Sequence, residues 1–252
     1  MSDKALAQTG ALKQPVRPNV DRRSALHKWL ACYWVACRCW TRYALVGRKQ
    51  GTRGLADLVT GNVFFSAVQV PSELAALGEI LVERCPARAL EIGTARGGTL
   101  FFLTRLASPH ATIVSVDLPG GKFVGNYNYT ARRKWIYQHF ARRQQQLVAI
   151  QGDSHSTETL QMVKSALEHQ SLDYLFIDGD HTYEGVKKDF EMYSALVRKG
   201  GLIALHDIVE GPPHAVGGVP QFWREVKSQY RHREIIDDPL QGGFGIGILH
   251  LE

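Results

Sequence analysis

The stretch that most constrains this chain is a glycine-rich turn between a short apolar strand and a helix. The strand is expected over 88–92, and the residues from Thr99 onward have helical spacing. Gly93, Gly97 and Gly98 stand at the turn, where glycine lets the backbone bend sharply and approach a ligand closely. The following helix begins with free N–H groups that can bind an anionic group. This order predicts a strand–turn–helix unit with a ligand site at the turn.

A second apolar strand over 112–117 ends in a carboxylate, Asp117, about 19 residues past the turn. In nucleoside-binding βαβ units an acid at this position accepts hydrogen bonds from the ribose hydroxyls. The glycine spacing, however, is not the G-x-G-x-x-G of dinucleotide sites, and an acid, Glu91, lies at the end of the first strand. A carboxylate there would repel a pyrophosphate, whereas it would attract a cationic ligand such as a sulfonium with an α-amino group.

The stretch Glu91-Ile-Gly-Thr-Ala-Arg-Gly-Gly98 resembles the first motif of class I S-adenosylmethionine-dependent methyltransferases, E-x-G-x-x-x-G-G. The resemblance implies that S-adenosylmethionine (SAM) is the cofactor. The alternative is an ordinary α/β turn whose glycines only permit tight packing. The residues expected to bind the cofactor are Gln69, Glu91, Gly93, Thr94, Arg96, Gly98, Asp117, Asp153, Ser154 and Asp178.

Beyond residue 60, strand and helix patterns alternate, and this order implies a mostly parallel sheet. Two final strands near 232–236 and 244–250 have a glycine-rich join, so we expect an antiparallel pair at one edge. The predicted fold is α/β: a Rossmann-like, doubly wound, seven-stranded sheet with a reversed C-terminal hairpin, as in class I methyltransferases. The other strands are expected over 88–92, 112–117, 147–151, 173–178 and 201–206, and the helices over 72–84 (with Ser72 as N-cap), 98–107, 131–144, 157–168, 183–198 and 219–229.

Polar residues gather just after these strands, where ligands bind in open α/β sheets. After the third strand, Asp153 can accept a hydrogen bond from the exocyclic amine of adenine, and Ser154 can bond to a ring nitrogen. The resemblance supports this role, because the family places its adenine contacts at the same strand end. The alternative is that both residues only cap the helix that begins at 157.

Two neighbouring loops carry carboxylates and imidazoles: Asp178-Gly-Asp-His-Thr-Tyr-Glu184 after the fourth strand and His206-Asp207 after the fifth. Oxygen-rich clusters of this kind suit Mg²⁺ or Mn²⁺, and an imidazole shifts the preference toward transition metals. The motif F-I-D-G-D-H, followed by L-H-D, resembles the catechol-type and macrolide-sugar O-methyltransferase branch. The resemblance implies a divalent ion held by Asp178 and Asp207, with His206, which stands where the branch usually has an acid, as a possible third ligand. The alternative is a hydrogen-bonded network of the loops with no ion.

The expected reaction is methylation of a hydroxyl on a small molecule, such as a natural-product sugar, a polyketide or a phenol. A hydroxyl is a poor nucleophile until a base removes its proton, and a divalent ion assists by lowering its pKa. His181 is the first candidate base, because imidazole titrates near neutral pH, and Asp178, Asp180 and His206 are the other candidate catalytic groups. The alternatives are a noncatalytic SAM-binding partner in a biosynthetic complex, or methylation of nitrogen, carbon or nucleic acid.

Residues 1–55 are expected to form a basic, aromatic helical extension, followed by the methyltransferase domain over 56–252. The apolar part of the aromatic helix 24–46 runs from 29 to 37 and is too short to span a bilayer. A membrane-surface role is less favoured than packing on the domain or on a second subunit, so we expect a homo-oligomer. The loops at 123–130 and 211–220 are expected to cover the site.

The chain carries a net charge of +6, with 30 Lys and Arg residues against 24 Asp and Glu residues. It shows no aromatic–basic alternation typical of RNA recognition, so no nucleic-acid partner is expected. Four cysteines are too few for a disulfide framework, and the first twenty residues have no apolar core, which favours a cytoplasmic protein. A solvated helix face, rather than a site for an acidic substrate, is the favoured interpretation of Arg132, Arg133, Arg142 and Arg143.

Overall fold

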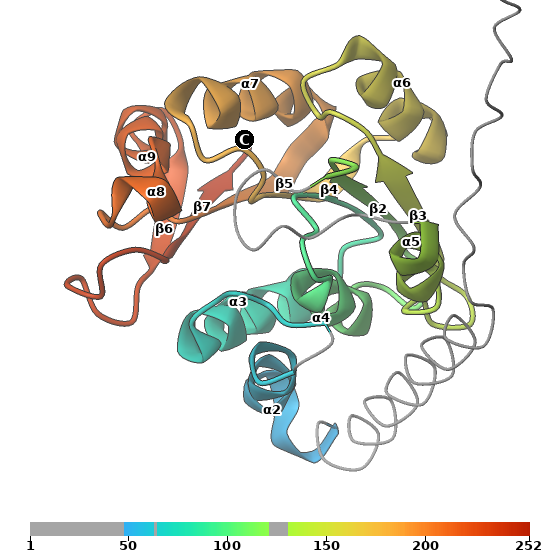
Figure 1. Cartoon of the computed structure of the whole chain (residues 1–252). Helices are drawn as coiled ribbons and strands as arrows, with labels where there is room; N and C mark the ends of the chain where they lie inside the picture. The colour runs from blue at the N-terminus through green and yellow to red at the C-terminus, as the bar shows by residue number, and fades with distance from the viewer. Residues whose placement is uncertain (1–47, 63–64, 121–130) are drawn as a thin grey trace, which may run out of the picture.

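The computed structural model describes residues 48–62, 65–120 and 131–252, which form helical layers on both faces of one sheet (Figure 1). The sheet has the strand order β3-β2-β1-β4-β5-β7-β6. Neighbours from β3 to β5 pair in parallel, whereas β7 is antiparallel to both β5 and β6. This confirms the predicted fold class. The strands are β1 (Arg88–Ile92), β2 (Thr112–Asp117), β3 (Gln146–Gln151), β4 (Leu172–Ile177), β5 (Val197–His206), β6 (Arg231–Ile235) and β7 (Ile246–His250).

Each face of the sheet has its own apolar core. The helices α2, α3, α4 and α5 pack on one face, where aromatic side chains such as Phe101 and Phe140 are buried. The helices α6, α7 and α9 cover the other face, where Trp223 is among the largest buried side chains. The bounds are α2 (Arg48–Thr60), α3 (Pro71–Arg84), α4 (Gly98–Leu106), α5 (Ala131–Gln138), α6 (Thr157–Ala166), α7 (Tyr183–Tyr193), α8 (Pro213–Val216) and α9 (Val219–Lys227).

Helix ends account for most differences from the sequence prediction. Ser72 is not the N-cap of α3: Val70 is, Pro71 begins the helix, and the Ser72 hydroxyl lies 2.5 Å from a carboxylate oxygen of Asp237. The helix predicted to reach residue 198 ends at Tyr193, because Val197 already pairs with Leu172 of β4. Helix α5 ends six residues earlier than predicted, at Gln138, and α8 was not predicted at all.

Helix α2 crosses the domain boundary predicted between residues 55 and 56. Its side chains Leu55, Ala56 and Val59 are buried in the core that α3 and α4 share, so α2 packs as part of the domain. The aromatic helix predicted over 24–46 lies outside the described residues. In the described part of the chain, no helix is both long and apolar enough to cross a membrane.

Candidate functional site

A cavity of about 440 Å³ opens at the carboxyl ends of the parallel strands. The loops that follow β1 to β5 all contribute to its lining, so the strand-end residues singled out in the sequence come together in one place. Of these, the lining residues are Gly93, Asp117, Asp153, Ser154, Asp178, Asp180, His181, His206 and Asp207. Gln69, Glu91, Thr94, Arg96 and Gly98 are not among the lining residues.

The turn after β1 and the acid after β2 are joined by direct hydrogen bonds. One carboxylate oxygen of Asp117 accepts from the backbone N–H of Ala95 at 2.7 Å, and the other accepts from Leu118 at 2.7 Å. Burial raises the pKa of Asp117, and backbone hydrogen bonds from Ala95, Leu118 and Thr94 only partly offset this. Each carboxylate oxygen has a second lone pair, so Asp117 can still accept hydrogen bonds from the hydroxyls of a ribose.

On the opposite side of the turn, Glu91 is only 1% exposed and lies within the sheet rather than on the cavity wall. Burial raises its pKa well above the usual value, which favours the neutral acid. From the sequence, Glu91 is expected to be a carboxylate that attracts a cation. In the structure, that attraction requires a cationic group to approach the buried acid.

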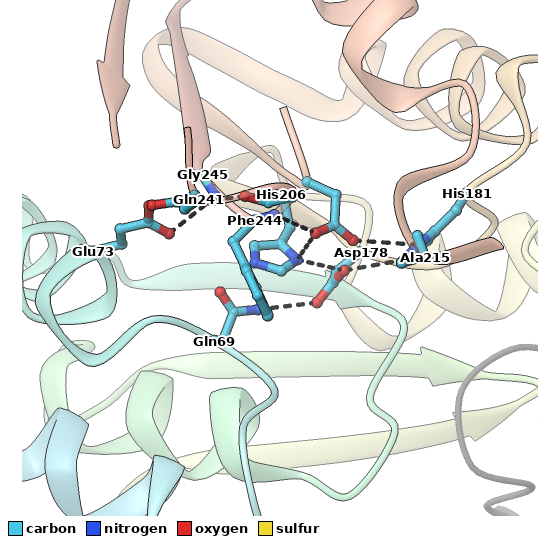
Figure 2. A network of polar contacts seen from close by, with 11 residues as sticks. Gln69, Glu73, Asp178, His181, His206, Ala215, Gln241, Phe244 and Gly245 are labelled. Atoms are coloured by element: carbon cyan, nitrogen blue, oxygen red, sulfur yellow. Dashed lines mark hydrogen bonds and ion pairs between the residues drawn. The ribbon is translucent and has the colours of Figure 1, made fainter. Parts of the chain in front are cut away.

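Three buried polar atoms near this turn have no hydrogen-bond partner among the described residues: Gln69 Oε1, Glu91 Oε2 and His206 Nε2. Gln69 and His206 each contact Asp178 through their other polar atom, at 3.2 Å in both cases (Figure 2). Buried polar groups are normally satisfied, so such atoms mark places where a ligand or water supplies the missing partner. The amino-acid end of SAM carries both donors and acceptors of the required kind.

Asp178, His181, His206 and Asp207 form a compact polar group, called here the Asp–His cluster. Figure 2 labels Asp178, His181 and His206. His181 lies between the two acids: its Nε2 is 3.4 Å from Asp178 and its Nδ1 is 3.3 Å from Asp207. His206 contacts both acids through Nδ1 alone, at 3.2 Å and 3.4 Å. The backbone carbonyl of Ala215, 2.5 Å from Nδ1 of His181, fixes the orientation of that ring.

The cluster is strongly coupled electrostatically. Burial alone would raise the pKa of Asp178, but the two histidines lower it to about 2. Burial alone would likewise lower the pKa of both histidines, but the acids raise the pKa of His181 to about 9 and that of His206 to about 10. Two protonated imidazoles therefore balance two carboxylates, and a single divalent ion would supply the same positive charge.

The cluster also contains ligands for such an ion. Among the described residues, Asp178, His181 and Asp207 each offer one ligand atom, and these atoms lie within 4.8 Å of one another. Two oxygens and one imidazole nitrogen suit Mn²⁺ or a similar divalent metal. The sequence had proposed His206 as the third ligand. In the structure the ligand atoms that lie together come from Asp178, His181 and Asp207, whereas His206 contacts both acids through Nδ1; the third ligand stays a prediction.

The adenine-side residues also lie at the cavity, and the capping alternative is wrong for them. The N-cap of α6 is Ser156, whose Oγ accepts from the N–H of Thr159, so Asp153 and Ser154 are not required as caps. His155, which the sequence analysis did not single out, lines the cavity beside them. Its Nε2 lies 3.3 Å from the fully buried Asp189. An acid inside the apolar face of a helix needs a polar partner, and this was the sequence signal that could have pointed to His155.

The remaining walls come from the segments between the strands. Ala215 and Val216, within the predicted cover 211–220, line the cavity, whereas the other predicted cover, 123–130, lies outside the described residues. Gly242, Gly243 and Phe244 of the β6–β7 loop form a wall that the sequence analysis missed. Only the glycine-rich composition of this loop could have indicated it.

Three of the six non-glycine residues with positive φ in the described part of the chain line this site. Ala95, Asp207 and Phe244 all line the cavity and have positive φ angles of 45°, 61° and 62°, which non-glycine residues rarely adopt. Such conformations persist only where the surroundings impose them, and they cluster at functional sites.

Two of the arginines that the sequence assigns to a solvated helix face, Arg133 and Arg142, donate hydrogen bonds to backbone carbonyls. Arg133 donates to Ala95 and Arg142 to Ala107, and neither arginine lines the cavity.

Residues 90–208 match the model of a family described as a methyltransferase domain. An uncharacterized protein of Sinorhizobium fredii, y4gI, is 30% identical over 165 residues, which are 64% of this chain and 17% of that protein. An uncharacterized protein of Acanthamoeba polyphaga mimivirus, R132, is 53% identical over 36 residues, 14% of this chain and 16% of that protein. The chain thus spans about a sixth of the length of the curated relatives it matches.

Solved structures resemble the chain over most of its length. An O-methyltransferase from Bacillus cereus in complex with SAH gives a TM-score of 0.54 at 18% identity, covering 79% of this chain and 90% of that one. TomG, an O-methyltransferase from Streptomyces achromogenes in complex with SAM, gives 0.54 at 16%, covering 80% and 90%. Cofactor-bound Rv0187 from MTB gives 0.54 at 17%, covering 95% and 99%. At these identities the likeness shows the fold alone.

Proposed function

We propose that this chain, which carries a class I methyltransferase domain over its parallel sheet, transfers the methyl group of SAM to a hydroxyl group of a small molecule. One observation carries the proposal: the ribose-type acid Asp117 and the Asp–His cluster line the same cavity. A cofactor held at one end would therefore present its reactive centre toward groups that can deprotonate an acceptor at the other end.

The cofactor half of the cavity is formed by the loops after β1, β2 and β3. Asp117 would accept from the ribose hydroxyls, and Asp153 and Ser154 would bind the adenine edge; all three line the cavity. Gln69 Oε1 and Glu91 Oε2 lack a partner but do not line the cavity, so the α-amino group of the methionine end has to reach behind the lining residues for these atoms to accept from it. SAM, when bound here, supplies an electrophilic methyl group on a sulfonium centre.

The acceptor half lies between the Asp–His cluster, α8 and the β6–β7 loop. In-line methyl transfer depends mainly on holding the two reactants close and aligned. In the site without an ion, His181 is the group that would take the proton from the acceptor hydroxyl, because it lies partly buried with a ring nitrogen toward each acid. The acids raise its pKa to about 9, so it acts as a base only in its neutral form, which alkaline pH favours. Asp180 is less suited to that role, because its Oδ1 accepts from the backbone N–H of Thr182 in the turn before α7.

A divalent ion, Mg²⁺ or Mn²⁺, is part of the proposal, and Asp178, His181 and Asp207 would hold it. When bound, such an ion would lower the pKa of the acceptor hydroxyl, and His181 would then be a ligand and not the base. His206 then fixes the two acids through Nδ1 from the buried side of the cluster.

The charges of the cavity indicate the kind of acceptor. Among the described residues that line it there are five aspartates and three histidines, but no lysine or arginine. A phosphate or carboxylate of the acceptor would meet no positive side chain except histidine, so nucleic acid and acidic metabolites fit poorly. Uncharged or amine-bearing hydroxyl compounds, such as sugars, polyketides or phenols, fit this lining.

The test has two stages. Calorimetry should first show that the full-length chain binds SAM and SAH, and an absence of binding would refute the proposal. Methyl transfer from labelled SAM is then measured with 4-methylcatechol, dopamine and 3,4-dihydroxyphenylacetate, which carry the same two hydroxyls with no charge, a positive charge and a negative charge. We expect a kcat/KM at least tenfold lower for the carboxylate compound than for either of the other two.

Two further results separate the alternatives. Tight SAM binding without turnover on these catechols, or on hydroxylated metabolites made by enzymes of neighbouring genes, would indicate a noncatalytic SAM-binding partner. If activity is instead found and survives exhaustive chelation, no divalent ion takes part, and His181 removes the proton unaided.

A further inference from the structure

Glu73, in the first turn of α3, is a buried acid that holds a distant loop. The residue is 1% exposed, and its carboxylate accepts three hydrogen bonds from the segment 237–245. Figure 2 shows Glu73 beside Gln241 and Gly245. Oε1 accepts from the N–H of Asp237 at 3.0 Å and from the side-chain amide of Gln241 at 2.7 Å, and Oε2 accepts from the N–H of Gly245 at 3.0 Å. A buried carboxylate is costly unless it is hydrogen-bonded, so Glu73 and this loop depend on each other.

The loop that Glu73 holds has an unusual backbone. Gly242, Gly243, Phe244 and Gly245 follow one another with φ angles of 73°, 128°, 62° and 80°. Phe244 carries a side chain in this left-handed region, where L residues are strained, so its surroundings must impose the conformation. Two consecutive backbone N–H groups donate to acids on different elements. The N–H of Phe244 donates to Asp207 at 3.1 Å, and the N–H of Gly245 donates to Glu73.

This geometry links Glu73 to the acceptor half of the cavity. The Phe244 ring meets the His206 ring edge-on, with centroids 6.0 Å apart, and both rings line the cavity. Gly243 faces α8 so closely that an added Cβ would lie 3.1 Å from a methyl carbon of Val216. The loop therefore sets the width of the acceptor half and the contact of Phe244 with the Asp–His cluster.

We propose that Glu73 is a positioning residue for acceptor recognition: it fixes the loop 241–245 so that Phe244 forms the apolar wall against which the acceptor packs. This inference rests on the proposed function. Glu73 itself is not among the residues that line the cavity and acts through Phe244. The loop is absent from the cofactor half, so its loss affects the acceptor and not SAM.

The substitution Glu73→Gln tests this in the full chain. Glutamine keeps the size of the side chain but offers one acceptor oxygen, so at least one of the three donors loses its partner. We expect amide hydrogen exchange across 241–245 to accelerate at least tenfold, while exchange in β1 and the dissociation constant for SAH change less than twofold. With 4-methylcatechol as acceptor, KM should rise at least fivefold at nearly unchanged kcat.

Two further variants separate positioning from a general loss of structure. Ser72→Ala removes the neighbouring contact to the Asp237 side chain at the exposed rim of the loop, and should leave KM unchanged. Phe244→Leu should raise KM like Glu73→Gln, and the double variant should be no worse than the more affected single variant, because both act through the same wall. Unchanged loop exchange in Glu73→Gln, or a parallel loss of SAH binding, would overturn the inference. A wild-type protein that methylates no catechol would count against the proposed function. Amide hydrogen exchange across 241–245 would still decide whether Glu73 fixes the loop.

Discussion

The backbones of Gly93 and Asp178 touch at the centre of the site: a Cβ added to Gly93 would lie 1.9 Å from the carbonyl oxygen of Asp178. A neighbouring hydrogen bond holds the two segments together: the N–H of Asp178 donates to the carbonyl of Ile92 at 2.9 Å. The glycine of the first motif and the acid of the Asp–His cluster are thus held in one fixed arrangement. A change at Gly93 should therefore disturb both halves of the cavity.

Gly93→Ala is expected to damage both stability and binding. Gly93 has a φ of 89°, so alanine is strained there even before its Cβ collides with Asp178. Strain and overpacking together should lower the free energy of unfolding by about 3 kcal/mol. Urea denaturation measures this change, and calorimetry should show SAH affinity at least tenfold weaker.

Gly242→Ala is the matched control. Gly242 also has a positive φ, 73°, but an added Cβ there meets nothing within 4 Å. Only the conformational strain remains, so the loss should be about 1 kcal/mol, with SAH affinity retained. Equal losses for the two variants would show that the close approach to Asp178 has no energetic consequence.

Asp117→Asn should weaken cofactor binding without unfolding the chain. An amide offers one acceptor oxygen, so it cannot serve the N–H groups of Ala95 and Leu118 and two ribose hydroxyls as the carboxylate can. Hydrogen bonds to a charged group contribute about 1.5–3 kcal/mol, so the SAH dissociation constant should rise roughly 10- to 100-fold. Asp57→Asn, at an exposed acid of α2, should leave calorimetric affinity unchanged.

The His155–Asp189 pair should make stability depend on pH. The hydrogen bond to Asp189 raises the pKa of His155, despite the opposing effect of burial. A raised pKa in the folded state means that the stabilisation is fully present below the unfolded value, about 6.5, and is lost as pH rises through the folded value. The stability difference between wild type and His155→Gln should therefore shrink as pH increases above about 6.5.

Urea denaturation at several pH values between 5.5 and 8.5 measures this difference. His110→Gln, at an exposed histidine, should leave the pH profile of the wild type unaltered. A stability difference for His155→Gln that stays constant over this range would contradict the role of the pair.

Self-association through the N-terminal extension remains a prediction. Because α2 packs into the core, the deletion that tests it should remove residues 1–47 and not 1–55. Light scattering should then report a smaller assembly than for the full chain, while calorimetry shows retained SAH binding. An unchanged mass would refute the interface role, and binding of the full chain to lipid vesicles would favour a membrane-surface role.

The sequence by itself determined the elements and the end of the sheet at which function lies. Continuous apolar runs such as 174–177 identify buried parallel strands. Asp117 ends its strand, and Asp178 and Asp207 follow theirs directly. These are local features, since strand propensity and strand-end position depend on residues within a few places of each other. The predicted fold followed from them and is confirmed, and the motifs that resemble those of methyltransferases lie within residues 90–208, which match the model of a methyltransferase domain.

Only the tertiary structure decided which side chains meet. His181 rather than His206 stands between the two acids, because ring orientation depends on partners such as the Ala215 carbonyl. The contact of Glu73 with Gly245 joins residues 172 positions apart, and it exists because α3 packs beside the hairpin that closes the sheet. No periodicity or spacing encodes such a pairing. It arises from how the layers pack, and that packing places Phe244 against the cluster.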